Sequence, residues 1–334
     1  MRLSDLDYEY PPELVATEPA RPSRVLCVHE GRPSEISIAD LLAKFKAGDV
    51  LVVNESKVLP RRVFAGDGSE ILFLKNISAR TWEVLFPARD RKPGERIALP
   101  GGVLARLVKK GLPQTLEADL SPEYFEKHGE VALPPYIQEA RGERRNRVSD
   151  QEWYQTAWAR VPGSVAAPTA SLHFSAGDLR ALENRGVRVA RVILHVGAGT
   201  FLPIRSADLD AHEMHSESVE IPNETLDIVR QAKREGRKVW ALGTTATRAL
   251  EAWANDHLTE NASGVAGETR LFIRPPYQFQ IVDRLLTNFH QPRSTLLSLV
   301  AAFADLEQVK RHYAWAIDRK FKLFSYGDLS AWIK

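Results

Sequence analysis

The sequence predicts an α/β fold in which a mainly parallel sheet with helices packed on it carries an inserted, small antiparallel β-barrel domain. After about residue 164 the chain repeats the order helix, strand, polar loop and helix, which is typical of parallel sheets. Residues 62–138 instead form short alternating runs separated by glycine and proline, as antiparallel sheets do. We therefore expect an α/β body over 1–61 and 151–334, with the barrel over 62–150.

Each predicted element has a local signal. Within the barrel segment, Pro100-Gly101-Gly102 separates two apolar runs and indicates a hairpin. In the body, Ser175 and Asp178 form a capping box at the start of a helix that Gly186 ends, and Ser294 can cap a later helix. The other expected body elements are strands at 50–53, 187–196, 238–242 and 284–287 and helices at 224–235, 246–254 and 295–304.

The composition is that of a globular protein. The 334 residues are 44% hydrophobic, which is enough apolar surface for a sizeable core in about two domains. Cys27 is the only cysteine, so an intramolecular disulfide is excluded and a reducing compartment fits. No run approaches the roughly 18 apolar residues of a membrane span. We expect a soluble, cytoplasmic monomer that does not bind a membrane.

The net charge of +2 does not indicate a nucleic-acid partner by itself. Binding to RNA would require a local basic patch, and the segment 141–147 is the candidate because only Glu143 opposes its arginines. Two interpretations stay open, a phosphate-binding patch and a solvated loop. The arginines are Arg141, Arg144, Arg145 and Arg147.

Polar residues follow four of the predicted strands. Ligands bind at the carboxyl ends of strands in open α/β sheets, where loops and helix N-termini converge. Four such loops favour a ligand-binding site at that edge of the sheet. They carry Asn54; His195 with Gly197, Gly199 and Thr200; Gly243, Thr244 and Thr245; and Asn288 with His290.

Two of these loops allow more than one interpretation. The N-terminus of the helix after Gly243 can bind an anion through free N–H groups, or Thr244 or Thr245 can cap it. The two glycines after His195 let the backbone approach a ligand or form a tight turn, but the third glycine of a dinucleotide-binding fingerprint is missing.

The string His-Glu-Met-His-Ser-Glu at 212–217 suggests two chemistries. His212, His215 and Glu217 can hold a divalent metal, but the histidine spacing is three rather than the four of a helical zinc motif. Imidazoles also supply acids and bases near neutral pH, which suits a metal-free transferase. We favour the second interpretation and expect no metal.

Long strings of the chain resemble one known family. The most distinctive runs from Pro162 to Ala170 and into Leu172-His173-Phe174, and the second spans 194–201. With 212–217, these strings resemble the S-adenosylmethionine:tRNA ribosyltransferase-isomerases of queuosine biosynthesis. Ser171, Glu55 and Pro276 depart from the family pattern without removing a titratable group. Shorter matches lie at 10–16, 52–54, 243–248, 268–273, 287–296 and 324–328.

The resemblance implies an enzyme that transfers and isomerises the ribosyl part of S-adenosylmethionine. The acceptor is 7-aminomethyl-7-deazaguanine at the anticodon wobble position of tRNA, and the products are epoxyqueuosine-tRNA, adenine and methionine. The family also has an α/β body and an inserted β-barrel. No cofactor is expected, because S-adenosylmethionine is a consumed substrate. The sulfonium acidifies the C5′ proton, so the reaction requires a general base.

The matching positions supply the candidate residues. A base or acid is expected among His195, His215, Glu217 and His290. The helix N-terminus with Arg248 is expected to bind the methionine carboxylate, and Phe174 and Phe289 either stack on a base or pack in the core. The substrate-binding candidates are Asn54, Ala167, Pro168, Thr169, His173, Phe174, Gly197, Gly199, Thr200, Thr244, Thr245, Arg248, Glu268, Thr269, Arg270, Asn288 and Phe289. The tRNA-binding candidates are Arg61, Arg62, Arg141, Arg144, Arg145 and Arg147.

Two other classes of function stay open on the sequence. A non-catalytic RNA-binding module would bind through the β insert and the basic segment, and a metal-dependent nucleotide hydrolase would use the 212–217 string. Release of adenine from S-adenosylmethionine distinguishes the enzyme from the first, and activity in the presence of a chelator distinguishes it from the second.

Overall fold

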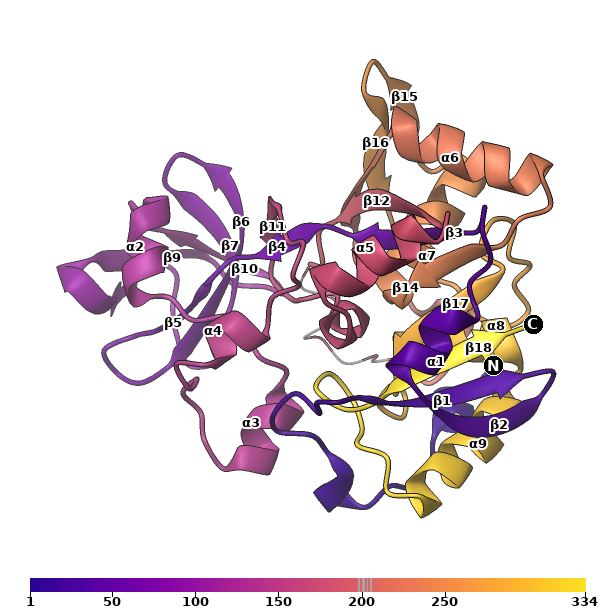
Figure 1. Cartoon of the computed structure of the whole chain (residues 1–334). Helices are drawn as coiled ribbons and strands as arrows, with labels where there is room; N and C mark the ends of the chain where they lie inside the picture. The colour runs from indigo at the N-terminus through magenta and orange to yellow at the C-terminus, as the bar shows by residue number, and fades with distance from the viewer. Residues whose placement is uncertain (198, 200–201, 203, 205) are drawn as a thin grey trace.

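The computed structural model describes residues 1–197, 199, 202, 204 and 206–334. Figure 1 shows a large body built on a ten-stranded sheet and a smaller unit, at the left, built on a six-stranded sheet. The strands of the large sheet, in spatial order, are β15 (Thr259–Asn261), β16 (Gly264–Thr269), β13 (Glu217–Pro222), β12 (Arg188–Leu194), β3 (Val50–Asn54), β14 (Val239–Leu242), β17 (Arg284–Asn288), β18 (Leu329–Ile333), β1 (Arg24–His29) and β2 (Arg32–Ser37).

The large sheet is mixed, so the prediction of a mainly parallel sheet is wrong. The four central strands β12, β3, β14 and β17 are parallel, and so are β1 and β18. The other five of the nine described pairings are antiparallel. Short connections such as those of β1 to β2 and β15 to β16 can join only antiparallel strands, and these hairpins extend both edges.

Helices cover both faces of the large sheet. Alternate residues of β3 face opposite layers: Val50 and Val52 join the core beneath α6 to α9, and Leu51 and Val53 join the core with α1 and α5. A buried strand covered on both faces explains why residues 50–53 are all apolar. The helices are α1 (Ile38–Ala43), α5 (Ala176–Asn184), α6 (Asn223–Arg234), α7 (Gly243–Ala254), α8 (Thr295–Ala304) and α9 (Leu306–Asp318).

Local signals in the sequence are confirmed at several helix ends. Ser175 and Asp178 form the capping box of α5, and Gly186 follows with a φ of 81°. The hydroxyl of Ser294 accepts a hydrogen bond from the N–H of Leu297 at the start of α8. No helix within the described ranges is long and apolar enough to cross a membrane.

The small unit is an antiparallel sheet with its own core, in which the rings of Phe73, Trp82 and Phe125 pack edge to face. The predicted hairpin at Pro100–Gly102 forms between β8 and β9. The barrel closure and the domain borders at 62 and 150 stay predictions. The strands, in spatial order, are β5 (Arg62–Phe64), β6 (Glu70–Ser78), β7 (Thr81–Leu85), β10 (Gln114–Glu117), β9 (Leu104–Lys109) and β8 (Arg96–Ala98).

A two-stranded parallel ribbon joins the two units. It pairs β4 (Ser56–Val58), where the chain leaves the body, with β11 (Val161–Ser164), where it returns. Three short helices follow β10 and precede β11 along the chain: α2 (Pro122–His128), α3 (Pro135–Arg141) and α4 (Asp150–Trp153). Described 3-10 turns are Leu3–Leu6, Pro12–Leu14, Pro100–Gly102, Thr169–His173 and Leu209–Ala211.

Candidate active site

The carboxyl ends of β3, β12, β14 and β17 meet at one edge of the large sheet, because these four strands are parallel neighbours. Each strand leads into one of the polar loops that the sequence singles out. The 3-10 turn Thr169–His173 lies against this edge: the Thr169 hydroxyl donates to the Asn288 side-chain oxygen at 3.0 Å. A Cβ on Gly243 would lie 3.5 Å from the Cβ of Ala170. The fold therefore gathers the main sequence strings into one site.

His195, which directly follows β12, is held against the backbone of Gly163. A Cβ on Gly163 would lie 2.6 to 2.8 Å from three atoms of the imidazole, so only glycine leaves room for the ring. The hydroxyl of Ser164 accepts from the N–H of Val196 at 3.0 Å and donates to the carbonyl of Ala166 at 2.6 Å. The ribbon strand β11 thus fixes both the ring and the chain after it.

The imidazole of His195 has the properties of a free base. Its Nδ1 is buried and has no hydrogen-bond partner among the described residues. Burial lowers its pKa, and the negative charge of Glu220 opposes that shift only in part. The ring is therefore neutral near pH 7, with a nitrogen free to accept a proton.

Glu217 and Arg248 form a buried ion pair through Oε2 and Nη1, with both side chains only 7% exposed. The other carboxylate oxygen of Glu217 accepts from the N–H of Gly197 at 3.4 Å. Nε of Arg248 donates to the carbonyl of Leu271 at 3.3 Å, whereas Nη2 is buried without a partner among the described residues. Arg248 thus keeps one unused nitrogen, and its charge is already shared with Glu217.

His212 and His215 precede Glu217 in the same segment, and they form no metal centre with the other described residues. Burial lowers the pKa of His212, and His215 adds to that shift. The ring of His212 packs edge-on against Phe272. Within the described ranges, no group of three or more His, Cys, Asp or Glu side chains is placed to hold a metal ion. The geometry therefore gives no support to a metal-dependent hydrolase.

His290 is buried and His173 is half-buried, and both are hydrogen-bonded. Burial lowers the pKa of both to about 3. Nε2 of His290 lies 2.8 Å from the Thr287 hydroxyl. Nε2 of His173 accepts from the Asn288 amide at 3.0 Å, so its Nδ1 donates to the Ser23 hydroxyl at 2.7 Å. Both rings are neutral near pH 7 and hydrogen-bonded, so they are less suited to proton transfer than His195.

The helix α7 begins at Gly243 without a side-chain cap. The alternative in which Thr244 or Thr245 is the N-cap is wrong, because both residues lie in the first turn of the helix. The hydroxyl of Thr245 is buried with no partner among the described residues. An uncapped N-terminus with a free hydroxyl is suited to an anion.

Several predicted substrate-binding residues have structural partners instead. The amide of Asn54, fully buried, donates to the carbonyl of Leu194 at 2.9 Å and accepts from the N–H groups of Leu194 and Ser56. Thr269 is fully buried and accepts from the N–H of Leu271. These two side chains therefore hold the walls of the site.

The remaining candidates differ in exposure. Phe289 packs in the core against Tyr313 and Phe321, which supports the core alternative for this ring. Glu268 is exposed and accepts from the Ser216 hydroxyl. Ala167, Pro168 and Phe174 are buried, Gly199 is half-buried, Arg270 is exposed, and Thr200 is outside the described residues.

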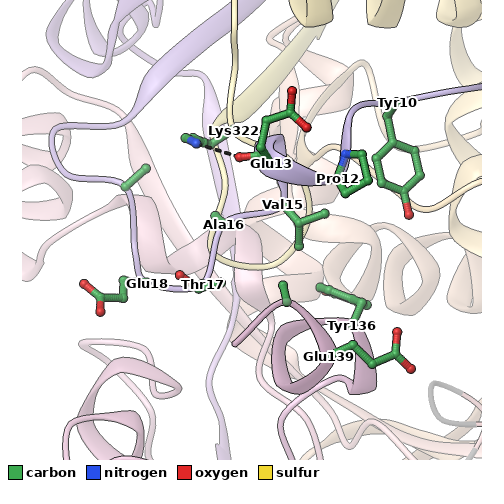
Figure 2. Close-up of a pocket in the computed structure, with 12 residues that line it drawn as sticks. Tyr10, Pro12, Glu13, Val15, Ala16, Thr17, Glu18, Tyr136, Glu139 and Lys322 are labelled. Atoms are coloured by element: carbon green, nitrogen blue, oxygen red, sulfur yellow. Dashed lines mark hydrogen bonds between the residues drawn. The ribbon is translucent and has the colours of Figure 1, made fainter. Parts of the chain in front are cut away.

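A separate hollow of about 970 Å³ lies between the N-terminal segment, α3 and Lys322 (Figure 2). Tyr10, Tyr136 and Glu139 line it, and Nζ of Lys322 donates to the carbonyl of Glu13 at 2.9 Å. The described lining includes none of the residues predicted for catalysis or for substrate binding, so we do not assign the reaction to it.

Comparison with known proteins identifies the family of this chain. Residues 3–331 match the family described as queuosine biosynthesis protein. The chain belongs to this family. It is 43% identical, over 99% of both chains, to the S-adenosylmethionine:tRNA ribosyltransferase-isomerase of Acidiphilium cryptum. It is 41% identical, over 98% of both chains, to the protein of the same name from Geobacter metallireducens.

A solved member of the queuosine biosynthesis family has a similar fold. The crystal structure of S-adenosylmethionine tRNA ribosyltransferase from Thermotoga maritima aligns with a TM-score of 0.57 at 30% identity. The alignment covers 99% of this chain and 100% of that one. The resemblance seen in the sequence strings is therefore confirmed, and neither alternative class of function is favoured.

The structure corrects the prediction of tRNA binding for two arginines of this chain. The side chain of Arg62 is 1% exposed and donates to Glu130 at 2.7 Å and Asn146 at 2.6 Å. Arg141 is equally buried and forms a bidentate pair with Asp150. Neither guanidinium reaches the surface, so neither can contact a phosphate in this conformation.

The rest of the basic segment is only partly free. Arg147 pairs with Glu18 and Glu143, and Arg145 pairs with Glu130. Arg144 is exposed and makes no ion pair in the described part of the chain. The local charge of this segment is thus largely offset by acids from elsewhere in the chain.

Gly163 and Ser164 were missed as candidate residues, although they stand in the longest matching string. Their role depends on the contact with His195 and Val196, about thirty residues away. Apart from that string, the sequence signals these two residues only as a glycine and a serine that follow a proline and fit no hairpin pattern.

Proposed function

We propose that this chain is an S-adenosylmethionine:tRNA ribosyltransferase-isomerase. It transfers and isomerises the ribosyl moiety of S-adenosylmethionine onto 7-aminomethyl-7-deazaguanine at the wobble position of tRNA. The products are epoxyqueuosine-tRNA, adenine and methionine. The observation that carries the proposal is the 43% identity to an enzyme of that name over 99% of both chains.

We assign the general base to His195. The sulfonium of S-adenosylmethionine acidifies the neighbouring C5′ proton, and a ring nitrogen of a neutral, fixed imidazole can accept it. The resulting ylide expels adenine, the substrate amine attacks the sugar fragment, and rearrangement to the epoxide releases methionine. His195 suits this role because burial lowers its pKa and its Nδ1 is unpartnered among the described residues.

The site also offers charged and polar groups for the methionine part of S-adenosylmethionine. The uncapped N-terminus of α7, with the unpartnered hydroxyl of Thr245 and Nη2 of Arg248, suits a carboxylate. Glu217 carries a negative charge next to Gly197, where it can attract the positive sulfonium. His215 stays a second candidate for proton transfer at the rim of this loop.

The reaction as proposed uses no metal and no separate cofactor, because S-adenosylmethionine is itself consumed. We further propose that the enzyme works as a cytoplasmic monomer, where tRNA and S-adenosylmethionine meet. The small sheet is proposed to curl into a barrel over 62–150. The hydrogen bond of 2.8 Å from the N–H of Gly66 to the carbonyl of Ala98 supports this closure, because it links the β5–β6 turn to β8.

The test is a reaction of the purified protein with S-adenosylmethionine and tRNA that carries the aminomethyl base. We expect adenine and methionine in equal amounts, with the same rate in a chelator. An RNA-binding module would bind the tRNA without releasing adenine, and a metal-dependent hydrolase would stop in the chelator. Either result would overturn the proposal.

A further inference from the structure

A cleft of about 990 Å³ lies between the body and the small unit. Its walls come from α1, α2, α4, the ribbon strand β4 with the linker after it, and residues 172–178. More than half of the lining side chains are apolar, including Phe125, Trp153 and Phe174. Its volume falls in the range of sites for small organic ligands.

Arg61 brings an unpaired positive charge to this cleft. Its guanidinium carbon lies 4.1 Å from the ring centre of Phe125 and 4.8 Å from that of Trp82. Its Nη1 is buried with no hydrogen-bond partner among the described residues, and burial lowers the pKa of the guanidinium. A guanidinium that aromatic rings hold in place, but that no acid of the described residues neutralises, is suited to an anion from outside the chain.

The next residue shows how this chain satisfies an arginine that has a structural role. Arg62 donates through Nη2 to Glu130, Asn146 and the carbonyl of Arg144, although its Nε and Nη1 have no hydrogen-bond partner among the described residues. Arg61 has no comparable set of acceptors in the described part of the chain. Arg62 is thus anchored through one nitrogen, whereas the Arg61 side chain makes no hydrogen bond or ion pair with any described residue.

Thr156 is a second polar group in the cleft wall without a partner. The residue is 5% exposed, and its hydroxyl makes no hydrogen bond with any described residue. Buried hydroxyl groups are normally paired, so this one is available for a hydrogen bond with a ligand atom in the cleft. This observation is independent of the charge of Arg61.

The other charges of the cleft allow an anion to enter. Arg21 and Lys57 add positive charge to its walls. Of the acids, Asp178 is occupied by the N–H and hydroxyl of Ser175, and Glu126 and Glu152 are exposed to solvent. An occupant with a flat apolar part and one anionic group fits this combination.

We propose that this cleft binds one nucleotide of single-stranded RNA, with its phosphate on Arg61, its base among the apolar walls and a polar atom on Thr156. Arginine binds phosphate in bidentate fashion, and unstacked bases pack against apolar and aromatic side chains. The inference rests on the proposed tRNA substrate. It places a second RNA contact across the ribbon from the reacting base, because β4 lines the cleft and its partner β11 holds His195.

The test measures binding of a short single-stranded RNA oligonucleotide, without S-adenosylmethionine, to the wild type and to three variants. Arg61→Gln should weaken binding about 10- to 100-fold, because it removes a charge-assisted hydrogen bond to the phosphate. Thr156→Val should weaken it about threefold or more without lowering the melting temperature, since its hydroxyl has no partner among the described residues. Arg80→Gln is the matched control: Arg80 is 65% exposed and pairs with Asp119 on the same small unit.

The outcomes separate this inference from the proposed function. Unchanged RNA affinity in both Arg61→Gln and Thr156→Val, or equal losses in Arg80→Gln, would overturn the cleft assignment. Adenosine monophosphate that binds as tightly as the oligonucleotide would overturn RNA as the occupant in favour of a free nucleotide. Adenine release by the wild type reports on the proposed function alone. If that activity is absent while oligonucleotide binding still depends on Arg61, the proposed reaction fails and the cleft assignment stands.

Discussion

Replacing Gly163 with alanine tests the placement of His195 with the smallest possible change. The new Cβ would lie 2.6 Å from Cε1, 2.7 Å from Nε2 and 2.8 Å from Nδ1 of the imidazole. Carbon atoms in contact prefer roughly 3.5 to 4.0 Å, so the ring must move by about 1 Å. A misplacement of that size costs about 100-fold in rate. We therefore expect adenine release by Gly163→Ala to fall by about two orders of magnitude.

The same substitution also strains the backbone, because Gly163 has a φ of 153°. Gly236→Ala controls for such strain: its φ is 68°, and nothing lies within 4 Å of the new Cβ. Gly163→Ala should also destabilise the wild type by about 1–3 kcal/mol through overpacking, and by less in a His195→Ala background. Thermal unfolding measures the stability, and quantification of adenine measures the rate. A Gly163→Ala enzyme that keeps more than about a tenth of wild-type turnover would refute the role of this contact.

Three further outcomes follow from the site and the basic segment. Burial lowers the pKa of His195, and the neutral ring is the base, so activity should fall only as the pH drops below about 6.5. A pH–rate profile whose acidic limb lies above that value would contradict the assignment. Arg248→Ala should weaken S-adenosylmethionine binding about 10-fold or more by calorimetry and destabilise the fold by about 3–5 kcal/mol, since Glu217 is left buried and unpaired. Adding Glu217→Gln to this variant should restore the stability but not the affinity. Full affinity in the single or the double variant would remove Arg248 from the site. Replacing Arg144 and Arg145 by glutamine should flatten the slope of log tRNA-binding constant against log salt concentration by about 0.7 for each phosphate that is no longer bound. Arg141→Gln should instead lower the free energy of unfolding by about 3–5 kcal/mol. An unchanged slope in the double variant would place the RNA-binding surface elsewhere.

The sequence by itself determined the local elements of this protein. Ser175 with Asp178, Ser294 and Gly186 predicted helix ends that the structure confirms. A cap is formed by groups three or four residues apart, so its physics is contained in a short window of sequence. The matching strings also identified the family, because they preserve the order of residues along nearly the whole chain.

The sheet topology and the partners of charged groups were decided only by the tertiary structure. The alternation of helix and strand predicted a mainly parallel sheet, which holds only for the central strands, because pattern alone does not say that hairpins extend both edges. Arg141 and Arg144 carry the same charge three residues apart, yet one is buried against Asp150 and the other is exposed. Glu217 and Arg248 become partners although thirty-one residues separate them. Desolvation and ion pairing depend on which distant segments pack together, and no local window of sequence contains that information.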